Sequence, residues 1–133
     1  MSSVPERIPP QNLEAEQSVL GSMLIEQEAI FAATEIIRPA DFYKEGHQKI
    51  FEAMLALSER GEPVDLVTLA EELKQKKILE AVGGIPYLTT LANTVPTAAN
   101  VTYYAKIVRE KAILRNLIHA ATGIVSKCFE DSD

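Results

Sequence analysis

The chain has 133 residues, of which 47% are hydrophobic and only 6% aromatic, and its net charge at neutral pH is −6. This length suits one domain with its own hydrophobic core, and the scarcity of strand-like alternation favours an all-helical bundle. The acidic balance argues against a surface built mainly to bind DNA, because phosphate contacts need clustered lysine and arginine.

The first eleven residues (1–11) carry Pro5, Pro9 and Pro10 among small and charged neighbours, a composition that predicts an extended, mobile arm. The arm lacks the hydrophobic core of a signal peptide. No apolar run in the sequence is long enough to span a membrane, so we expect a cytoplasmic protein.

Residues 12–96 are expected to form the globular part, beginning with a helix that Asn12 caps. Gly21 lies inside this helix, where glycine costs about 1 kcal/mol relative to alanine, and this predicts a close approach of another backbone. The buried face is expected to hold the apolar residues Leu13, Ala15, Val19, Leu20, Met23 and Leu24.

Four shorter helices are predicted next. The first covers residues 28–37, because the residue before Pro39 disfavours helical backbone, and the second covers residues 47–57. His47 shares the buried face of the second helix, so we expect a core histidine with satisfied hydrogen bonds rather than a catalytic base.

The third of these helices begins after Asp65, a good N-cap, and ends at the lysine cluster within residues 74–77. We interpret this cluster as the favourable cationic end of a helix rather than as a nucleic-acid patch. The fourth helix has Pro86 in its first turn and ends before Pro96.

Residues 97–133 are predicted to hold one helix of more than thirty residues, with Thr97 as its cap. Its first half carries one apolar stripe at helical spacing, which fits a helix lying on the globular part. In its second half apolar residues alternate at steps of three and four, the spacing of a coiled-coil seam. The stripe is Val101, Tyr104, Ala105, Val108 and Ala112, and the seam is Leu114, Leu117, Ala121, Ile124 and Cys128, flanked by Ile113, Ile118, Ala120 and Val125.

Burying five such seam side chains would contribute on the order of 10 kcal/mol, so this apolar face needs a neighbour. The helix folds back on the globular part, or the chain is a piece of a longer protein, or the face pairs with another subunit. A further alternative is a helix that bends at Gly123 and frays at its end. Cys128 is the only cysteine, and we expect it to be a buried, reduced thiol on the seam.

The sequence carries no recognisable chemistry of an enzyme. None of its six glycines is followed by lysine, which excludes a phosphate loop of the G-x-x-x-x-G-K-S/T type. His47 and His119 have neither metal-ligand spacing nor a paired nucleophile, so no catalytic residue and no metal ligand is predicted. A helical interaction module is the favoured class.

Four ordered segments carry a resemblance to a known family. They are PPQNLEAEQSVLGSML (residues 9–24), DFYKEGHQKIFEAM (41–54), GEPVDLVTLAEEL (61–73) and GGIPYLTTLANTVPTAANVTYYAKIVREK (83–111). Together they resemble the N-terminal domain of the bacterial replicative DNA helicases of the DnaB family. The resemblance extends from about Arg7 to the end of the chain and is specific, because it is spread over four blocks.

The resemblance implies a domain that continues, in the family, into the second helix of a helical hairpin, a linker and an ATPase motor with a phosphate loop. The long helix would be the first half of that hairpin, with the second half absent from this chain. ATP and magnesium would belong to the motor, so no cofactor is expected here. Hairpins from two subunits would pair, and six domains would form a collar, a trimer of dimers, above the motor ring.

The resemblance also implies partners and contact residues. The main partner would be the C-terminal helicase-binding domain of DnaG primase, with other helicase subunits and a helicase loader as further partners. Tyr87, Ile118, Ile124 and Glu14 match the family's primase-contact positions, although the two isoleucines and Tyr87 could equally serve packing. The residues expected to pair subunits are Leu114, Leu117, Ala121, Ile124 and Val125.

A rival hypothesis is a domain that handles single-stranded DNA, since the family's helicases encircle that strand. The acidic composition argues against strong binding, so DNA contact is expected to be weak or absent. An enzyme is the weakest of the three classes.

Overall fold

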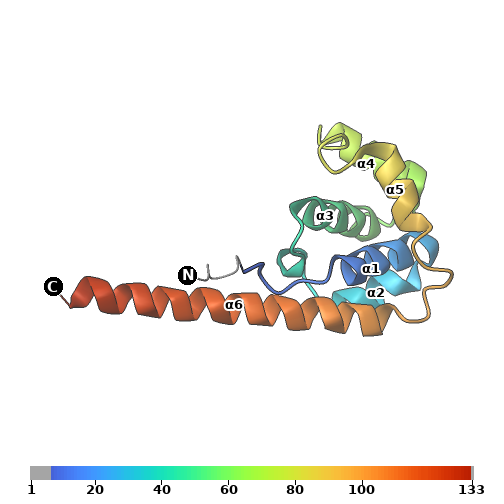
Figure 1. Cartoon of the computed structure of the whole chain (residues 1–133). Coiled ribbons are helices and arrows are strands. Elements are labelled where there is room, and N and C mark those ends of the chain that lie inside the picture. Colours follow the sequence, from blue (N-terminus) through green and yellow to red (C-terminus); the bar gives the residue numbers. More distant parts are fainter. Residues whose placement is uncertain (1–6, 133) are drawn as a thin grey trace, which may run out of the picture.

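In the computed structural model, which describes residues 7–132, one long helix carries all the other helices on one of its ends (Figure 1). The elements in chain order are α1 (Leu13–Ile25), α2 (Glu28–Thr34), the 3-10 helix η1 (Pro39–Asp41), α3 (Glu45–Glu59), α4 (Leu66–Gln75), α5 (Gly84–Ala92) and α6 (Val101–Asp131). The described range contains no strand, which confirms the expected all-α fold with six helices. Within that range, no helix is both long and apolar enough to cross a membrane.

Local signals set most of the helix boundaries as the sequence predicts. The Asn12 side chain accepts a hydrogen bond from the Ala15 amide at 2.9 Å and so caps α1. Asp65 and Thr68 cap α4 reciprocally, each side chain bonding the other's backbone amide at 2.9 Å. Gly61 follows α3 with a φ of 73°, the left-handed conformation that ends many helices.

Three local expectations were wrong. Helix α2 ends at Thr34 rather than Ile37, because the chain must reach the extended conformation of Arg38 that Pro39 requires. Thr97 does not cap α6: its hydroxyl accepts from the Ala99 amide at 2.8 Å inside the preceding turn, and the helix begins only at Val101. Leu13 is 38% exposed, because it occupies the first position of α1.

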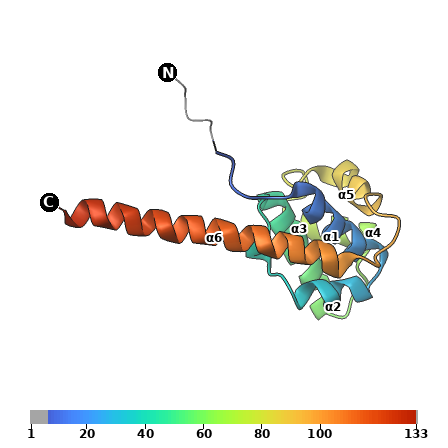
Figure 2. The same cartoon turned by 60° about the horizontal axis from the view of Figure 1, so that its bottom comes forward.

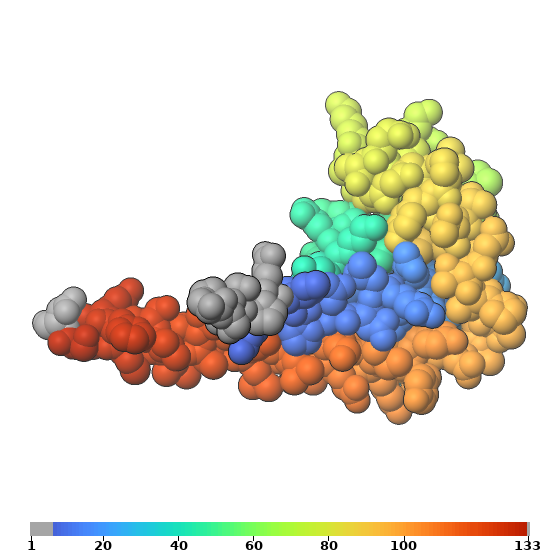
Figure 3. All heavy atoms as spheres, in the orientation of Figure 1, coloured from blue at the N-terminus to red at the C-terminus, as the bar shows by residue number. Residues whose placement is uncertain are grey.

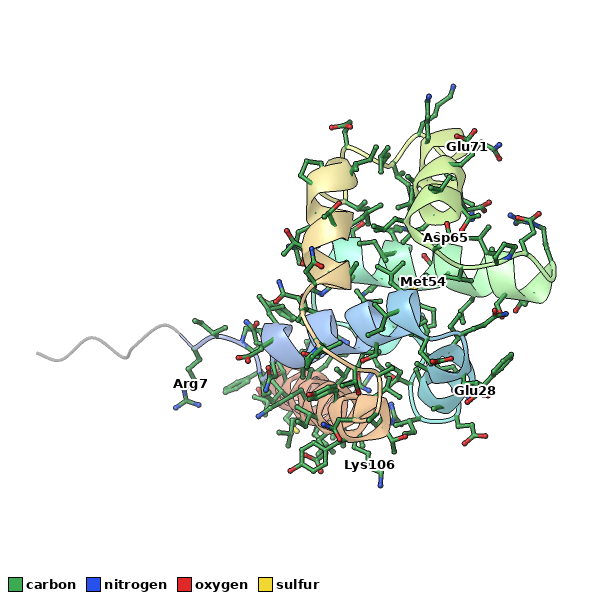
Figure 4. All side chains as sticks on the ribbon, turned by 90° about the vertical axis from the view of Figure 1, so that its right-hand side faces the viewer. Arg7, Glu28, Met54, Asp65, Glu71 and Lys106 are labelled. Carbon is green, nitrogen blue, oxygen red and sulfur yellow. The ribbon has the colours of Figure 1, made fainter. Side chains whose placement is uncertain are left out.

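All six α-helices contribute to the core, within which α1 packs against both α5 and α6. A Cβ atom added at Gly21 of α1 would overlap the carbonyl oxygen of Leu91 in α5, which confirms the predicted close backbone approach. Met54 of α3 is fully buried among the helices, whereas the labelled charged residues lie at the outer surface (Figure 4).

The two halves of α6 have different surroundings. Val101, Ala105, Val108 and Ala112 are buried against the body, and α1 and α2 lie along this half (Figure 2). The second half extends beyond the body (Figure 3), and the helix continues unbroken through Gly123 to Asp131. A bend at Gly123 and a helix folded back on the body are therefore both ruled out.

A charge cluster joins the end of α3 to α4. The Arg60 guanidinium donates to Glu72 at 2.6 Å and to Glu62 at 3.2 Å, and the Lys76 ammonium lies 3.4 Å from the second Glu72 oxygen. The hydrogen bond from Arg60, opposed by burial and assisted by Lys76, lowers the pKa of the Glu72 carboxyl below its ordinary value. The charged carboxylate therefore stabilises the folded state.

We predict that Gly21→Ala lowers the free energy of unfolding by about 1 to 3 kcal/mol, because the new methyl group collides with backbone that cannot rotate away. Urea denaturation monitored by circular dichroism measures the change. Gly123→Ala is the matched control, since a Cβ there meets no atom within 4 Å. An equal loss in both variants would contradict the close approach.

We predict that Glu72→Gln makes the free energy of unfolding fall less steeply as the pH is lowered. Because the folded-state pKa lies below the unfolded value, the stabilisation is present above about pH 4.5 and is lost as the pH falls through the folded-state pKa. Thermal unfolding between about pH 7 and pH 3 tests this. Glu71→Gln is the control, since Glu71 is exposed and forms no ion pair within residues 7–132; identical profiles for the two variants would refute the prediction.

Candidate functional site

A chain of buried polar side chains connects α1, α3 and α5. The Nδ1 atom of His47 lies 2.7 Å from a carboxylate oxygen of Glu16, and its Nε2 atom lies 2.6 Å from the hydroxyl of Tyr87. Glu16 is 1% exposed and His47 is completely buried, so these bonds are shielded from water. The expectation that His47 is a satisfied core histidine is confirmed.

The donor and acceptor roles in this row of hydrogen-bonded side chains follow from the chemistry of its groups. A carboxylate only accepts, so Nδ1–H of His47 donates to Glu16, and in neutral His47 the Nε2 atom then accepts the hydroxyl proton of Tyr87. The Tyr87 oxygen accepts from Gln17 at 3.1 Å, and the Tyr43 amide donates to the second Glu16 oxygen at 2.7 Å. Across residues 7–132 no buried side-chain nitrogen or oxygen lacks a hydrogen-bond partner.

This arrangement resembles an acid–histidine–hydroxyl series. Tyr87 does not line the main pockets found among residues 7–132, and its hydroxyl has hydrogen-bond partners in both His47 and Gln17. No cluster of three potential metal ligands occurs in the described part of the chain. The geometry supports an organising role for these residues.

The surface over the contact between α1 and α5 is accessible from outside the protein. Tyr87 is half-buried, and the exposed Lys44 places its ammonium 4.6 Å from the centre of the Tyr87 ring. Glu14 is exposed in the first turn of α1, one turn before Gln17. Tyr87 and Glu14, both expected as docking residues, therefore belong to the surface around the α1–α5 contact.

The second candidate surface is the projecting half of α6. Every predicted pairing residue is exposed, as are both isoleucines expected to contact a partner: Leu114, Leu117, Ile118, Ala121, Ile124 and Val125. Ile124 is 65% exposed and Leu117 is 60% exposed, so the apolar face is open over about three turns. Cys128 is also exposed, which corrects the expectation of a buried thiol on the seam.

A groove links this helix to the N-terminal segment. Arg115 donates to the Pro10 carbonyl and to the Asp41 carbonyl, both at 2.7 Å, and lies over the Tyr43 ring. These contacts fix the last residues of the predicted arm beside Ile118, while residues 1–6 of that arm lie outside the described residues. The predicted domain boundaries at residues 11 and 96 stay predictions.

Sequence reasoning placed Glu16, Lys44 and Arg115 at no site. Glu16 lies in the first turn of α1, three and four residues before Val19 and Leu20 on the buried face. A carboxylate on an apolar stripe was the available signal. No local sequence pattern predicts the contact of Arg115 with Pro10, which is 105 residues away.

Several known proteins resemble this chain in sequence and in fold. The sequence matches the family described as "DnaB-like helicase N terminal domain" over residues 8–110. It is 56% identical to the replicative DNA helicase DnaC of Bacillus subtilis and 55% identical to the replicative DNA helicase DnaB of Geobacillus stearothermophilus, over 128 residues in each case. These matches cover 96% of this chain but 28% of each relative, so the chain spans little more than a quarter of their length.

Solved structures give the same result. The N-terminal domain of DnaB helicase from Mycobacterium tuberculosis matches with a TM-score of 0.90 and 53% identity, covering 92% of this chain and 85% of that one. A DnaB-like replicative helicase, described with its interactions with primase, matches at 32% identity with a TM-score of 0.75, over 87% of this chain and 27% of its own. The N-terminal domain from Helicobacter pylori shares the fold at 23% identity and a TM-score of 0.75, over 87% of this chain and 90% of that one.

Proposed function

Because this chain belongs to the family of DnaB-like helicase N-terminal domains, we propose that it is the non-catalytic assembly and docking domain of a replicative DNA helicase. The observation that carries the proposal is the open apolar face of the projecting half of α6. A monomeric protein rarely exposes a long apolar stripe, so this face is suited to another helix.

Subunit pairing is the first proposed role. Leu114, Leu117, Ala121 and Ile124 recur at the spacing that two helices need to interlock, Val125 flanks them, and all five are exposed. In this proposal α6 packs with a second helix of a hairpin and with the hairpin of another subunit. Repetition around a ring gives a hexameric collar built as a trimer of dimers.

Primase docking is the second proposed role. Two structural relatives are described with their interactions with primase, and one of them is 32% identical to this chain. In this chain Tyr87 and Glu14 offer one surface at the α1–α5 contact, and Ile118 and Ile124 offer another on α6. Accessible aromatic and apolar side chains are typical anchors for a helical partner.

The remaining partners follow from the same proposal. ATP and magnesium would bind the motor of the whole helicase, and this domain would need no cofactor of its own. A helicase loader would bind the assembled collar in the cytoplasm. The net charge of −6 favours weak or no DNA binding by this domain.

We predict that Ile124→Asp weakens binding to the C-terminal helicase-binding domain of the cognate primase by at least about tenfold, because it buries a charge in an apolar contact. Isothermal titration calorimetry measures the affinity. Circular dichroism is expected to show an unchanged melting temperature of the body, since Ile124 is 65% exposed.

The matched control is Val67→Asp, which places the same charge at an apolar residue of α4 that is 79% exposed. It is expected to bind primase like the unmodified chain. Equal weakening by both substitutions, or a wild-type chain that does not bind at all, would remove primase docking by α6 from the proposal. A fall in melting temperature for Ile124→Asp alone would instead show that this residue is part of the core.

A further inference from the structure

The hydroxyl of Tyr87 is fully engaged inside the protein. It donates to Nε2 of His47 at 2.6 Å and accepts from Gln17 at 3.1 Å. A phenol has one donor and few acceptor sites, so these bonds leave little for an external group. Tyr87 is nevertheless only partly buried, so the remaining surface of its side chain is what a partner can contact.

The two rings of the pair are held end to end. Their planes differ by 9° and their centroids are 5.9 Å apart. The short bond joins Nε2 of His47 to the hydroxyl at the far end of the phenol, so the rings lie edge beside edge in nearly parallel planes. His47 therefore fixes the tip of Tyr87 without covering its faces.

Other groups limit how the Tyr87 ring can turn. A Cβ added at Gly83 would lie 2.6 Å from Cβ and 2.8 Å from Cγ of Tyr87, so the backbone before α5 is in close contact with the base of this side chain. The Lys44 ammonium lies over the ring at 4.6 Å. The ring is thus held at its base by backbone and at its tip by a buried hydrogen bond.

We propose that Glu16 and His47 are positioning residues that fix the Tyr87 ring as a preformed contact for a protein partner. The partner packs an apolar side chain on the ring and does not bind the hydroxyl. Glu16 acts through His47, since its carboxylate selects the tautomer whose Nε2 accepts the phenolic proton. Fixing the ring before binding reduces the entropy lost on association. This inference rests on the proposed role of Tyr87 in primase docking.

The first test is a double-mutant cycle on binding of the helicase-binding domain of primase. His47→Leu is expected to weaken binding by about fivefold to tenfold in the unmodified chain, because the ring is no longer held. In the Tyr87→Ala background it is expected to change the affinity by less than about twofold, since no ring is left to position. Equal losses in both backgrounds would overturn the inference, because His47 would then act without Tyr87.

Glu16→Gln is the second variant, and it keeps the cycle informative if His47→Leu fails to fold. It preserves the size of the side chain and removes the charge that selects the tautomer of His47. We expect a loss of about threefold that also disappears in the Tyr87→Ala background. A loss that persists there would equally contradict the positioning role.

The second test needs no partner. The chain has only two histidines, so ring-nitrogen NMR reports His47 directly, with His119 on the exposed half of α6 as an internal control. We expect neutral His47 in the Nδ1–H tautomer, and we expect Tyr87→Phe to shift its Nε2 resonance but not that of His119. An Nε2–H tautomer, or no shift, would overturn the inference.

The two tests separate the two claims. A wild-type chain that does not bind primase removes the proposed docking and, with it, the positioning role, whatever the NMR result. Binding with an additive cycle leaves the proposed docking intact and removes only the role of Glu16 and His47.

Discussion

The packing of the first half of α6 against α1 and α2 is the contact on which the rest of this domain depends. Val101, Ala105, Val108 and Ala112 are at most 5% exposed, and their small or β-branched side chains allow the helices to approach closely. An isolated segment the length of the second half would be a marginal helix in water. Because the first half is anchored, helix formation beyond Ala112 is propagation from an existing helix, which is much easier than nucleation.

The anchoring of α6 determines how its apolar face is presented to a partner. A helix that is fixed at one end and projects from the body presents its apolar face in one defined orientation. Full burial of each large aliphatic side chain on that face is worth about 1.5 to 3 kcal/mol, so a partner helix gains enough to offset the cost of association. Tyr87 lies in α5 of the globular part, whereas Ile118 and Ile124 lie on the projecting half of α6. In this proposal the domain carries two surfaces, and the one on α6 serves both assembly and docking.

Much of this fold could be predicted because its determinants are local. Asn12 and Asp65 cap helices with their own side chains, and the stripe from Val101 to Ala112 needs only helical spacing to be recognised. The same spacing identified the exposed face of α6. Thr97 shows the limit, since its hydroxyl stabilises a turn instead of capping a helix, and α6 begins three residues later than expected.

The relay of Glu16, His47 and Tyr87 could not be predicted in the same way. Its members are 31 and 40 residues apart in sequence, and their meeting depends on how α1, α3 and α5 cross. The contacts of Arg115 and the exposure of Cys128 could not be predicted for the same reason. Whether a residue on a helix meets a backbone carbonyl, a partner helix or solvent is decided by the tertiary arrangement, which spacing alone does not contain.

The most direct test of the account is sedimentation equilibrium of this chain over a wide concentration range, beside Leu117→Asp. If the projecting half of α6 is an assembly surface, the unmodified chain self-associates as its concentration rises, and the variant remains monomeric with an unchanged melting temperature. Leu117 is 60% exposed, so the substitution does not disturb the core. A chain that stays monomeric up to about millimolar concentration, or self-association that Leu117→Asp leaves unchanged, would contradict the central claim.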